Sequence, residues 1–321
     1  MRPLKLVPEN TNIDFLRLRT VFMALSVLLI VASIALVAMR GLNFGVDFAG
    51  GQMVRVTFAQ PVPVSEVRQK IDGLGLGESA IQQFGSDRDV AIRLPLPKGG
   101  AEATDQQGNR LREFITTTWP GATIGSVDTV SGKVSQELFQ KGALALGLAM
   151  AAIAVYIWIR FEWQFGIGAL FSLAHDVALT FGFFAITQLE FNLNIVAAIL
   201  TIIGYSLNDT IVVYDRVREN LRKYRKMEII PLLNLSTNET LSRTIVTSLT
   251  LIIALATLVL VGPEVIFGFS IAMLLGIVIG TYSSIYIANP ILIWAKVGPH
   301  SFVPKDTGPA GAERVKAKEL P

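Results

Sequence analysis

The sequence contains no cysteine and only two histidines, and charged residues make up 17% of its 321 positions. The lack of cysteine excludes disulfide bonds, thiolate metal sites and cysteine nucleophiles. The signatures of common hydrolases and nucleotide-binding enzymes are missing too, since the chain has no GxxxxGK[ST] phosphate loop, no HExxH and no GxSxG. The sequence therefore predicts no enzyme, no metal site and no cofactor.

Long apolar runs dominate what is present. Hydrophobic residues account for 51% of the chain, and its mean hydropathy is +0.52. A soluble domain of this size does not require several uninterrupted apolar runs. Each run is long enough to cross a bilayer as a helix. The predicted fold class is therefore a polytopic α-helical membrane protein with six transmembrane helices, in the runs Val21–Met39, Gly142–Ile159, Phe165–Ile186, Ile195–Tyr214, Ile245–Gly262 and Ile266–Trp294.

The two ends of the chain are predicted to be polar segments. Residues 1–20 precede a first transmembrane helix at residues 21–40, which is too long for a typical signal-peptide core. The sequence Met39-Arg40-Gly41 is also a poor cleavage site, so we expect this helix to be retained. Residues 295–321 are polar and contain proline and glycine, and we expect them to be disordered.

Residues 41–137 form a soluble insertion between the first and second apolar runs, and residues 138–294 hold the other five. Within the insertion, segments typical of strands and amphipathic helices alternate in the order β-α-β-β-α-β. This order is that of the split-βαβ, ferredoxin-like plan. The expected elements are a strand at 52–58, a helix at 64–74, strands at 80–84 and 89–94, a helix at 107–118 and a strand at 123–130.

Two glycine-containing stretches of the insertion are expected to be mobile. Pro95–Gly108 is rich in proline, glycine and polar residues and is predicted to be a loop. Gly41–Gly51 offers backbone N–H groups to an anion, but no clear helix start follows it. We therefore favour a flexible hinge between the first transmembrane helix and the first strand.

Basic residues predict the orientation of the chain. The net charge of +3 and the pI near 9.1 do not indicate nucleic acid, because the basic side chains cluster beside membrane spans. Seven lie in a polar loop predicted at 215–244, whereas the turns at 187–192 and 262–265 have none. Under the positive-inside rule both termini are then cytoplasmic, and residues 41–137 lie in the periplasm of a bacterium with two membranes.

Small residues mark two helix faces for close packing. In the last apolar run, Gly268, Ala272, Gly276, Gly280, Ser284 and Ala288 follow one another at four-residue spacing. This continuous stripe favours contact with another helix, in this chain or in a second one. Ala197, Thr201, Gly204 and Asn208 form a similar face on the fourth run.

Asp209 is the main candidate for chemistry. It lies inside an apolar run, where an ionisable side chain costs about 2.5–3.5 kcal/mol on insertion scales, so a functional role is the default. Ser236 and Glu239 have the spacing of a capping box, which predicts that the next helix begins there. Arg243 would then lie at a depth similar to that of Asp209 and could pair with it, so that the carboxyl loads and releases a proton. A buried packing role for Asp209 and snorkelling for Arg243 are the alternatives.

Other polar residues are weaker candidates. Asp176 shares one helix face with Gly168 and Ser172, so we expect it to point into the bundle. Its neighbour His175 would point about 100° away, which favours an ordinary interior polar group over a relay. Asn208 and Asp215 are possible supporting residues, although Asp215 lies at the membrane edge and favours a role in ordering the loop. Three isolated carboxylates are predicted to be solvated or capping: Asp14, Asp47 and Asp128.

Four segments resemble the SecF family of the resistance-nodulation-division superfamily. They are GLNFGVDFAGG at Gly41–Gly51, LAHDV at Leu173–Val177, GYSLNDTIVVYDRVREN at Gly204–Asn220 and NETLSRTIVTS at Asn238–Ser248. The resemblance implies a subunit of the bacterial inner membrane that uses the proton motive force to assist the later stages of Sec-dependent export. It implies Asp209 as the proton-carrying carboxylate and Arg243 as its partner.

The resemblance also implies partners. They are a SecD chain, the SecYEG channel, YajC and SecA, together with membrane lipid and an unfolded preprotein as substrate, but no nucleic acid. The alternative function is an RND-type, proton-coupled exporter of lipids or small molecules. Such exporters normally carry both six-span halves in one chain and larger external domains, so the small insertion argues against it. A purely structural scaffold is a third possibility.

Overall fold

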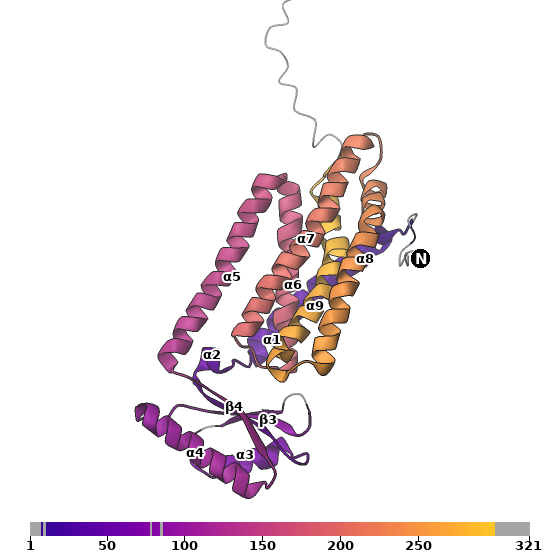
Figure 1. Cartoon of the computed structure of the whole chain (residues 1–321). Coiled ribbons are helices and arrows are strands. Elements are labelled where there is room, and N and C mark those ends of the chain that lie inside the picture. Colours follow the sequence, from indigo (N-terminus) through magenta and orange to yellow (C-terminus); the bar gives the residue numbers. More distant parts are fainter. Residues whose placement is uncertain (1–7, 9–10, 78, 84–85, 299–321) are drawn as a thin grey trace, which may run out of the picture.

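The computed structural model describes residues 8, 11–77, 79–83 and 86–298. Most of the predicted tail, from residue 299 onward, and much of residues 1–20 lie outside this range. In the described part of the chain, six helices are long and apolar enough to cross a membrane. They form a bundle with a small αβ domain at one end, here called the domain end (Figure 1). The predicted fold class is confirmed.

The six spans reach further than the apolar runs. The first combines a short 3₁₀ turn, Phe15–Leu18, with α1, Arg19–Arg40. The last consists of α9, Phe267–Ser283, a π-helical segment η3, Ser284–Ala288, and α10, Asn289–Trp294. A short 3₁₀ turn, η2, spans Glu264–Ile266. The four between them are α5, Gly132–Arg160, α6, Trp163–Thr187, α7, Leu193–Lys223, and α8, Ile229–Val261.

The prediction of a polar loop at 215–244 is wrong for most of its length. Helices α7 and α8 continue through it, and only residues 224–228 connect them. The predicted capping box is wrong as well: Ser236 lies inside α8 and donates to the carbonyl of Leu232 at 2.8 Å. Glu239 instead accepts from Arg216 and from Asn220, each at 2.7 Å. The Ser236 bond thus lies within α8, and the Glu239 bonds join α8 to α7.

The small domain has the predicted order of elements. Its strands are β1, Gly51–Thr57, β2, Ala80–Gln83, β3, Asp89–Leu94, and β4, Thr123–Val130, in the antiparallel order β2-β3-β1-β4. Helices α3, Val64–Asp72, and α4, Gly100–Thr118, cover the face away from the bundle (Figure 1). Alternate residues point to opposite faces of a strand, so Val54 and Val56 enter the core under these helices while Arg55 faces the bundle.

The loop predicted at Pro95–Gly108 is correct only up to Gly99, because α4 begins at Gly100. Its first turns are polar but rich in good helix formers, and Thr104 and Gln107 are buried there. Gly108, which had indicated a loop, lies inside the helix. A Cβ at this position would come within 2.9 Å of the Gln52 side chain, so the glycine permits α4 to approach β1 closely.

The core of the bundle is made by three spans. Half or more of the residues in the apolar stretches of α6, α7 and the final span are buried inside the protein. In α5 the buried share is 11%, and this helix stands at the edge of the bundle (Figure 1). The predicted small-residue stripe packs against α7 of the same chain: an added Cβ at Gly268 would contact Ile195, at Gly276 Ile202 and at Gly280 Ser206. The face of α7 predicted to pack is exposed instead, at Ala197, Thr201, Gly204 and Asn208.

The predicted hinge at Gly41–Gly51 is an ordered segment that connects the bundle to the small domain. We call it the connector. Its glycines turn the chain in left-handed conformations, with φ of 68° at Gly41, 69° at Gly50 and 115° at Gly51. Between them lies the short helix α2, Val46–Ala49, which packs on α5. Phe44 forms a backbone bridge with Phe191 in the loop between α6 and α7. Whether the connector bends stays a prediction.

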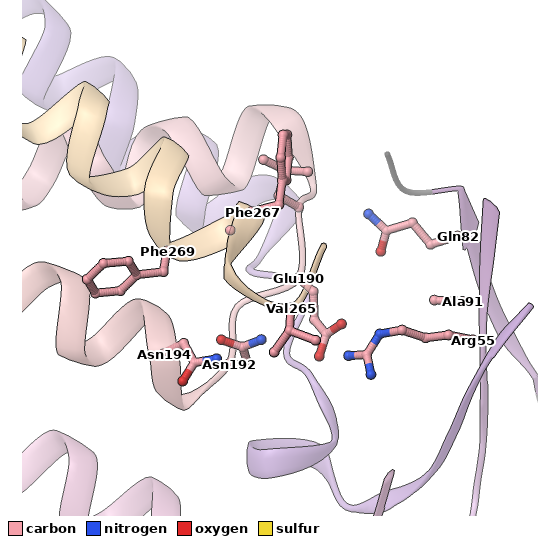
Figure 2. Close-up of a pocket in the computed structure, with 11 residues that line it drawn as sticks. Arg55, Gln82, Ala91, Glu190, Asn192, Asn194, Val265, Phe267 and Phe269 are labelled. Atoms are coloured by element: carbon pink, nitrogen blue, oxygen red, sulfur yellow. The ribbon is translucent and has the colours of Figure 1, made fainter. Parts of the chain in front are cut away.

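Glu190 in the α6–α7 loop faces the small domain. Its carboxylate points toward the guanidinium of Arg55 on β1 across a cavity of about 80 Å³ (Figure 2). Burial raises the pKa of Glu190 above its ordinary value of 4.5. Arg55 and Arg93 oppose this rise in pKa, and the nearby carboxylates Asp47 and Asp128 add to it. The protonated form of Glu190 therefore suits the docked domain better than the ionised form.

We predict that Gly276→Val lowers the free energy of unfolding by about 1–3 kcal/mol, because its side chain overlaps Ile202 in the α7–α9 contact. Gly204→Val on the exposed face of α7 is the matched control, since an added Cβ there meets nothing within 4 Å. Unfolding of both variants in detergent, followed by circular dichroism, checks this. Equal stability of the two would contradict the packing described here.

We also predict that Glu190 makes domain docking dependent on pH. Its stabilising contribution is fully present below its unfolded pKa, near the ordinary value of 4.5, and is lost as pH rises through the higher native value. Hydrogen exchange of the α6–α7 loop measures the docking across this window. Glu190→Gln is expected to remove the dependence, whereas Glu113→Gln on the exposed side of α4 retains it. A pH profile unchanged by Glu190→Gln would refute the assignment.

Candidate functional site: two buried carboxylates among hydroxyl groups

Asp209 lies in the core of the bundle, 6% exposed, on α7. Its Oδ1 accepts from Thr244 Oγ1 of α8 at 2.6 Å, and its Oδ2 accepts from Ser284 Oγ of η3 at 2.6 Å. Three spans thus converge on one carboxyl group. Because burial of an ionised carboxylate is unfavourable without donors, these two hydroxyl groups are what permits the charged form here.

Asp176 is a second buried carboxylate, on α6. Its Oδ2 accepts from Ser206 Oγ of α7 at 2.5 Å and from Ser283 Oγ of α9 at 2.9 Å. The expectation that it points into the bundle with Gly168 and Ser172 is confirmed, since all three are buried. The adjacent residues Ser283 and Ser284 therefore hold the two carboxylates, one each.

His175 is completely buried and contacts its neighbour. Its Nδ1 lies 2.9 Å from Asp176 Oδ1, so the expectation that adjacent side chains point apart is wrong for this pair. The two side chains turn toward one another at the level of their terminal atoms. Among the described residues, no hydrogen-bond partner of Nε2 is found. His175 is thus a satisfied interior group on one side of the ring only.

Each serine has a second acceptor within reach. Ser284 Oγ lies 3.1 Å from the carbonyl oxygen of Thr281, and Ser283 Oγ lies 3.2 Å from that of Gly280. A serine can donate to an ionised carboxylate, or it can turn to the backbone and accept from the protonated carboxyl. The site can therefore satisfy both protonation states of each carboxyl without moving a helix.

The π-helical segment places Ser284 and leaves backbone groups to be satisfied. Pro290 follows it and has no N–H to continue an α-helical ladder, which is a usual cause of such an irregularity. The carbonyl of Ala288 accepts from the buried Tyr214 hydroxyl of α7 at 2.9 Å. Gly168 on α6 has no Cβ, and one there would overlap the Tyr214 hydroxyl. Segments of this type occur often at functional sites.

Arg243 is exposed on α8 and is not within ion-pair distance of Asp209 in the described structure. Its neighbour Thr244 contacts Asp209 instead. Arg243 and Asp209 are thus at similar depth in the bundle, as predicted, but they do not form the predicted ion pair in this conformation. Asn208 is exposed beside Asp209. Asp215 lies at the end away from the small domain and pairs with Arg160 at 3.2 Å and Arg218 at 3.8 Å. It links α7 to the end of α5.

The three isolated carboxylates have structural partners. Asp14 accepts from Asn234 at 2.7 Å, and Asp128 pairs with Arg55 at 2.5 Å. Asp47 accepts from the backbone N–H of Leu193 at 2.9 Å, which makes it a capping residue for α7. Within the described residues, no three histidine, cysteine, aspartate or glutamate side chains come together as a metal site would require.

The donors to the carboxylates were not predicted. Ser206, Ser283 and Thr244 stand in apolar helices, where single hydroxyl residues are common, and Ser284 was counted only as a small residue of the packing stripe. The spacing of Ser206, three residues before Asp209, does indicate that it shares the buried face of this helix, although its acceptor there is Asp176. Nothing in the sequence, however, indicates which two helices bring Thr244 and Ser284 to the same carboxyl.

Two family models match the chain. The C-terminal model of the SecD/SecF protein export membrane proteins covers residues 111–298, and the SecD/SecF GG-motif model covers residues 35–62. The protein translocase subunit SecF of Cereibacter sphaeroides is 45% identical over 316 residues, which are 97% of this chain and 97% of the relative. SecF of Rickettsia bellii is 45% identical over 295 residues, 90% of this chain and 95% of the relative.

Solved structures show the same arrangement of elements. SecDF of Thermus thermophilus, a translocon-associated membrane protein, matches with a TM-score of 0.83 at 32% identity over 92% of this chain. A SecDF in a super-membrane-facing form matches with a TM-score of 0.64 at 31% identity. The chain spans 40% of the length of each of these SecDF chains. Together with the family models and the curated relatives, these matches show that the chain is a multi-pass membrane protein that belongs to the SecF branch of the SecD/SecF family of protein export membrane proteins.

Proposed function

We propose that the chain couples the proton motive force to protein export through Asp209. The observation that carries this proposal is a carboxyl group buried inside a membrane span and held by two hydroxyl groups, one of which has an alternative acceptor. A residue of this kind inside a span is a functional site by default. One charge that crosses about 100 mV of membrane potential supplies about 2.3 kcal/mol, so an ion gradient is a sufficient source of work.

The proton cycle uses only groups already in contact. When Asp209 is ionised, Thr244 and Ser284 donate to it. When a proton arrives on Oδ2, the carboxyl donates to Ser284 Oγ, and the serine turns its own proton to the carbonyl of Thr281. Asp176 and Ser283 have the same choice with Gly280. We assign Asp176 a supporting role in proton transfer. Asn208 supports the same step as a polar residue exposed beside Asp209.

The role of Arg243 is that of a mobile counter-charge. Its side chain is exposed, and its neighbour Thr244 donates to Asp209. Movement of the guanidinium toward Asp209 favours release of the proton, because a neighbouring cation stabilises the ionised carboxylate. Asp215 takes a different role at the edge of the membrane, where it orders the end of α7 through its ion pairs with Arg160 and Arg218.

A SecD-type chain is the proposed partner in the membrane. The SecDF neighbour and the SecD/SecF family support this partnership, and this chain spans 40% of the SecDF chain. The exposed face Ala197, Thr201, Gly204 and Asn208 on α7 offers close helix contact directly beside Asp209. Transfer of preprotein would then involve the SecYEG channel and SecA, with YajC as a further component.

The proposed location is the inner membrane of a bacterium. Basic residues gather at the α7–α8 connection, at Arg216, Arg218, Arg222, Lys223, Arg225 and Lys226, whereas the domain-end turns 188–192 and 262–266 have none. The positive-inside rule therefore favours cytoplasmic termini and a periplasmic small domain.

Asp209→Asn is predicted to abolish the part of translocation that depends on an imposed proton gradient while ATP-driven translocation continues. The complex with the SecD-type partner is incorporated in inverted vesicles, and completion of preprotein translocation is followed with and without the gradient. Asp87→Asn is the control, since Asp87 is an exposed carboxylate of the small domain, away from the site. Arg243→Gln should lower the gradient-dependent part. A sodium gradient that substitutes for protons would assign the site to Na⁺, and an unchanged gain in Asp209→Asn would make Asp209 a packing residue.

Ser284→Ala is predicted to slow the gradient-dependent step by about tenfold or more. The reason is that a hydrogen bond to a charged group contributes about 1.5–3 kcal/mol and about 1.4 kcal/mol corresponds to a tenfold rate. Ser284→Thr, which retains the hydroxyl, should keep most of the rate. Thr257→Ala deletes an exposed hydroxyl on α8 that donates to the carbonyl of Ile253 in its own helix, and it serves as the matched control. The same rate in Ser284→Ala and Thr257→Ala would remove Ser284 from the mechanism.

A further inference from the structure

The loop that joins α6 to α7, residues 188–192, is the point where the small domain meets the two carboxylate-bearing helices. We call it the hairpin tip. Helix α6, which carries Asp176, ends at Thr187, and Gln188 turns the chain with a left-handed φ of 55°. Helix α7, which carries Asp209, begins at Leu193. Any group that fixes the hairpin tip therefore fixes the ends of both helices.

The carbonyl of Gln188 is held by two amide side chains. Asn43 of the glycine-rich connector donates to it from Nδ2 at 3.0 Å, and Gln82 of β2 donates to it from Nε2 at 2.5 Å. Asn43 also donates to the side-chain oxygen of Gln82. The connector, the sheet of the small domain and the end of α6 thus meet in one small network.

The start of α7 is capped by a residue from a distant part of the chain. The first N–H of the helix, at Leu193, donates to Asp47 Oδ2 at 2.9 Å, although Asp47 precedes it by 146 residues. Asn192, at the N-cap position, makes no side-chain cap, and in the described structure its Oδ1 has no hydrogen-bond partner. A carboxylate at this position satisfies an N–H that the helix leaves unpaired and interacts favourably with the helix dipole.

Asp47 itself is fixed to the small domain and to α5. It lies in α2, within the GG-motif region at residues 35–62. Gly50 and Gly51, both with positive φ, connect α2 directly to β1. Gly45, at the start of α2, has no room for a side chain because a Cβ there would overlap the Glu190 carboxylate of the hairpin tip. Arg93 of β3 donates to the carbonyl of Phe44 from the domain side.

We propose that Asp47 and Gln82 form a joint that ties the position of the small domain to the positions of α6 and α7, with Asp47 as a positioning residue for the proton-coupled step. Displacement of the domain from the bundle breaks the Asp47 cap and the Gln82 contact together. The α6–α7 hairpin is then released at its tip, and the shift is carried along both helices to Asp176 and Asp209. This inference rests on the proposed function only for its second half, the link to proton coupling.

The joint itself is tested by distance measurement. The chain has no cysteine, so Glu113→Cys on α4 and Val261→Cys on α8, both exposed, accept spin labels uniquely in an otherwise unchanged chain. In the complete complex in lipid discs, Asp47→Ala is expected to lower the ratio of docked to displaced molecules by about fivefold, the size typical for loss of a helix cap. Asp47→Asn, which keeps a capping oxygen, should restore the docked ratio. Gln82→Ala should act in the same direction as Asp47→Ala.

Coupling is tested by the translocation assay with the same variants. Asp47→Ala should lose most of the gradient-dependent gain, Asp47→Asn should keep it, and Asp87→Ala, an exposed carboxylate of the same domain, should behave as wild type. An unchanged distance distribution in both Asp47→Ala and Gln82→Ala would overturn the joint. A changed distribution with full gradient-dependent gain would overturn its role in coupling. If Asp209→Asn also keeps the gain, the proposed function fails while the distance measurement still decides the joint.

Discussion

The bundle depends on one constraint: a carboxyl group inside a membrane span must have hydrogen-bond donors in each charge state that it adopts. Asp209 and Asp176 meet this constraint with hydroxyl groups from neighbouring helices. Hydroxyl groups suit the task because they donate and accept, and a rotation of one bond exchanges the two roles. The small-residue contact between α7 and α9 is what brings these short side chains within reach.

Irregular backbone occurs where the polar groups gather. The π-helical segment begins at Ser284, and the Tyr214 hydroxyl satisfies the Ala288 carbonyl within it. At the domain end, the helices α6 and α7 likewise rely on side chains from outside the bundle, Gln82 and Asp47. The ends of α6 and α7 therefore depend on hydrogen bonds from outside these two helices at the place where the small domain docks. A change in the docking of the domain is thus expected to change the positions of these helix ends.

Much of this architecture can be predicted from the sequence. Hydrophobicity locates six spans, short alternating segments give the strand order, and a carboxyl in an apolar run marks Asp209. What the sequence does not show are contacts made between distant segments: the Ser284 and Thr244 donors, the Asp47 cap, and the pairing of Glu239 on α8 with Arg216 on α7. The contact between His175 and Asp176 is a further example, because helix geometry describes Cβ directions and leaves open how side chains turn at their ends.

The serines that hold the two carboxylates come late in the chain. Ser284 follows Asp209 by 75 residues, and Ser283 follows Asp176 by 107. During synthesis, α6 and α7 are complete before the last span exists, so both aspartates reach the bilayer without these donors. The neutral, protonated carboxyl is the form with the smaller cost of transfer at that stage. The insertion of the final helix is thus the event that completes the pair of hydroxyl donors around each aspartate.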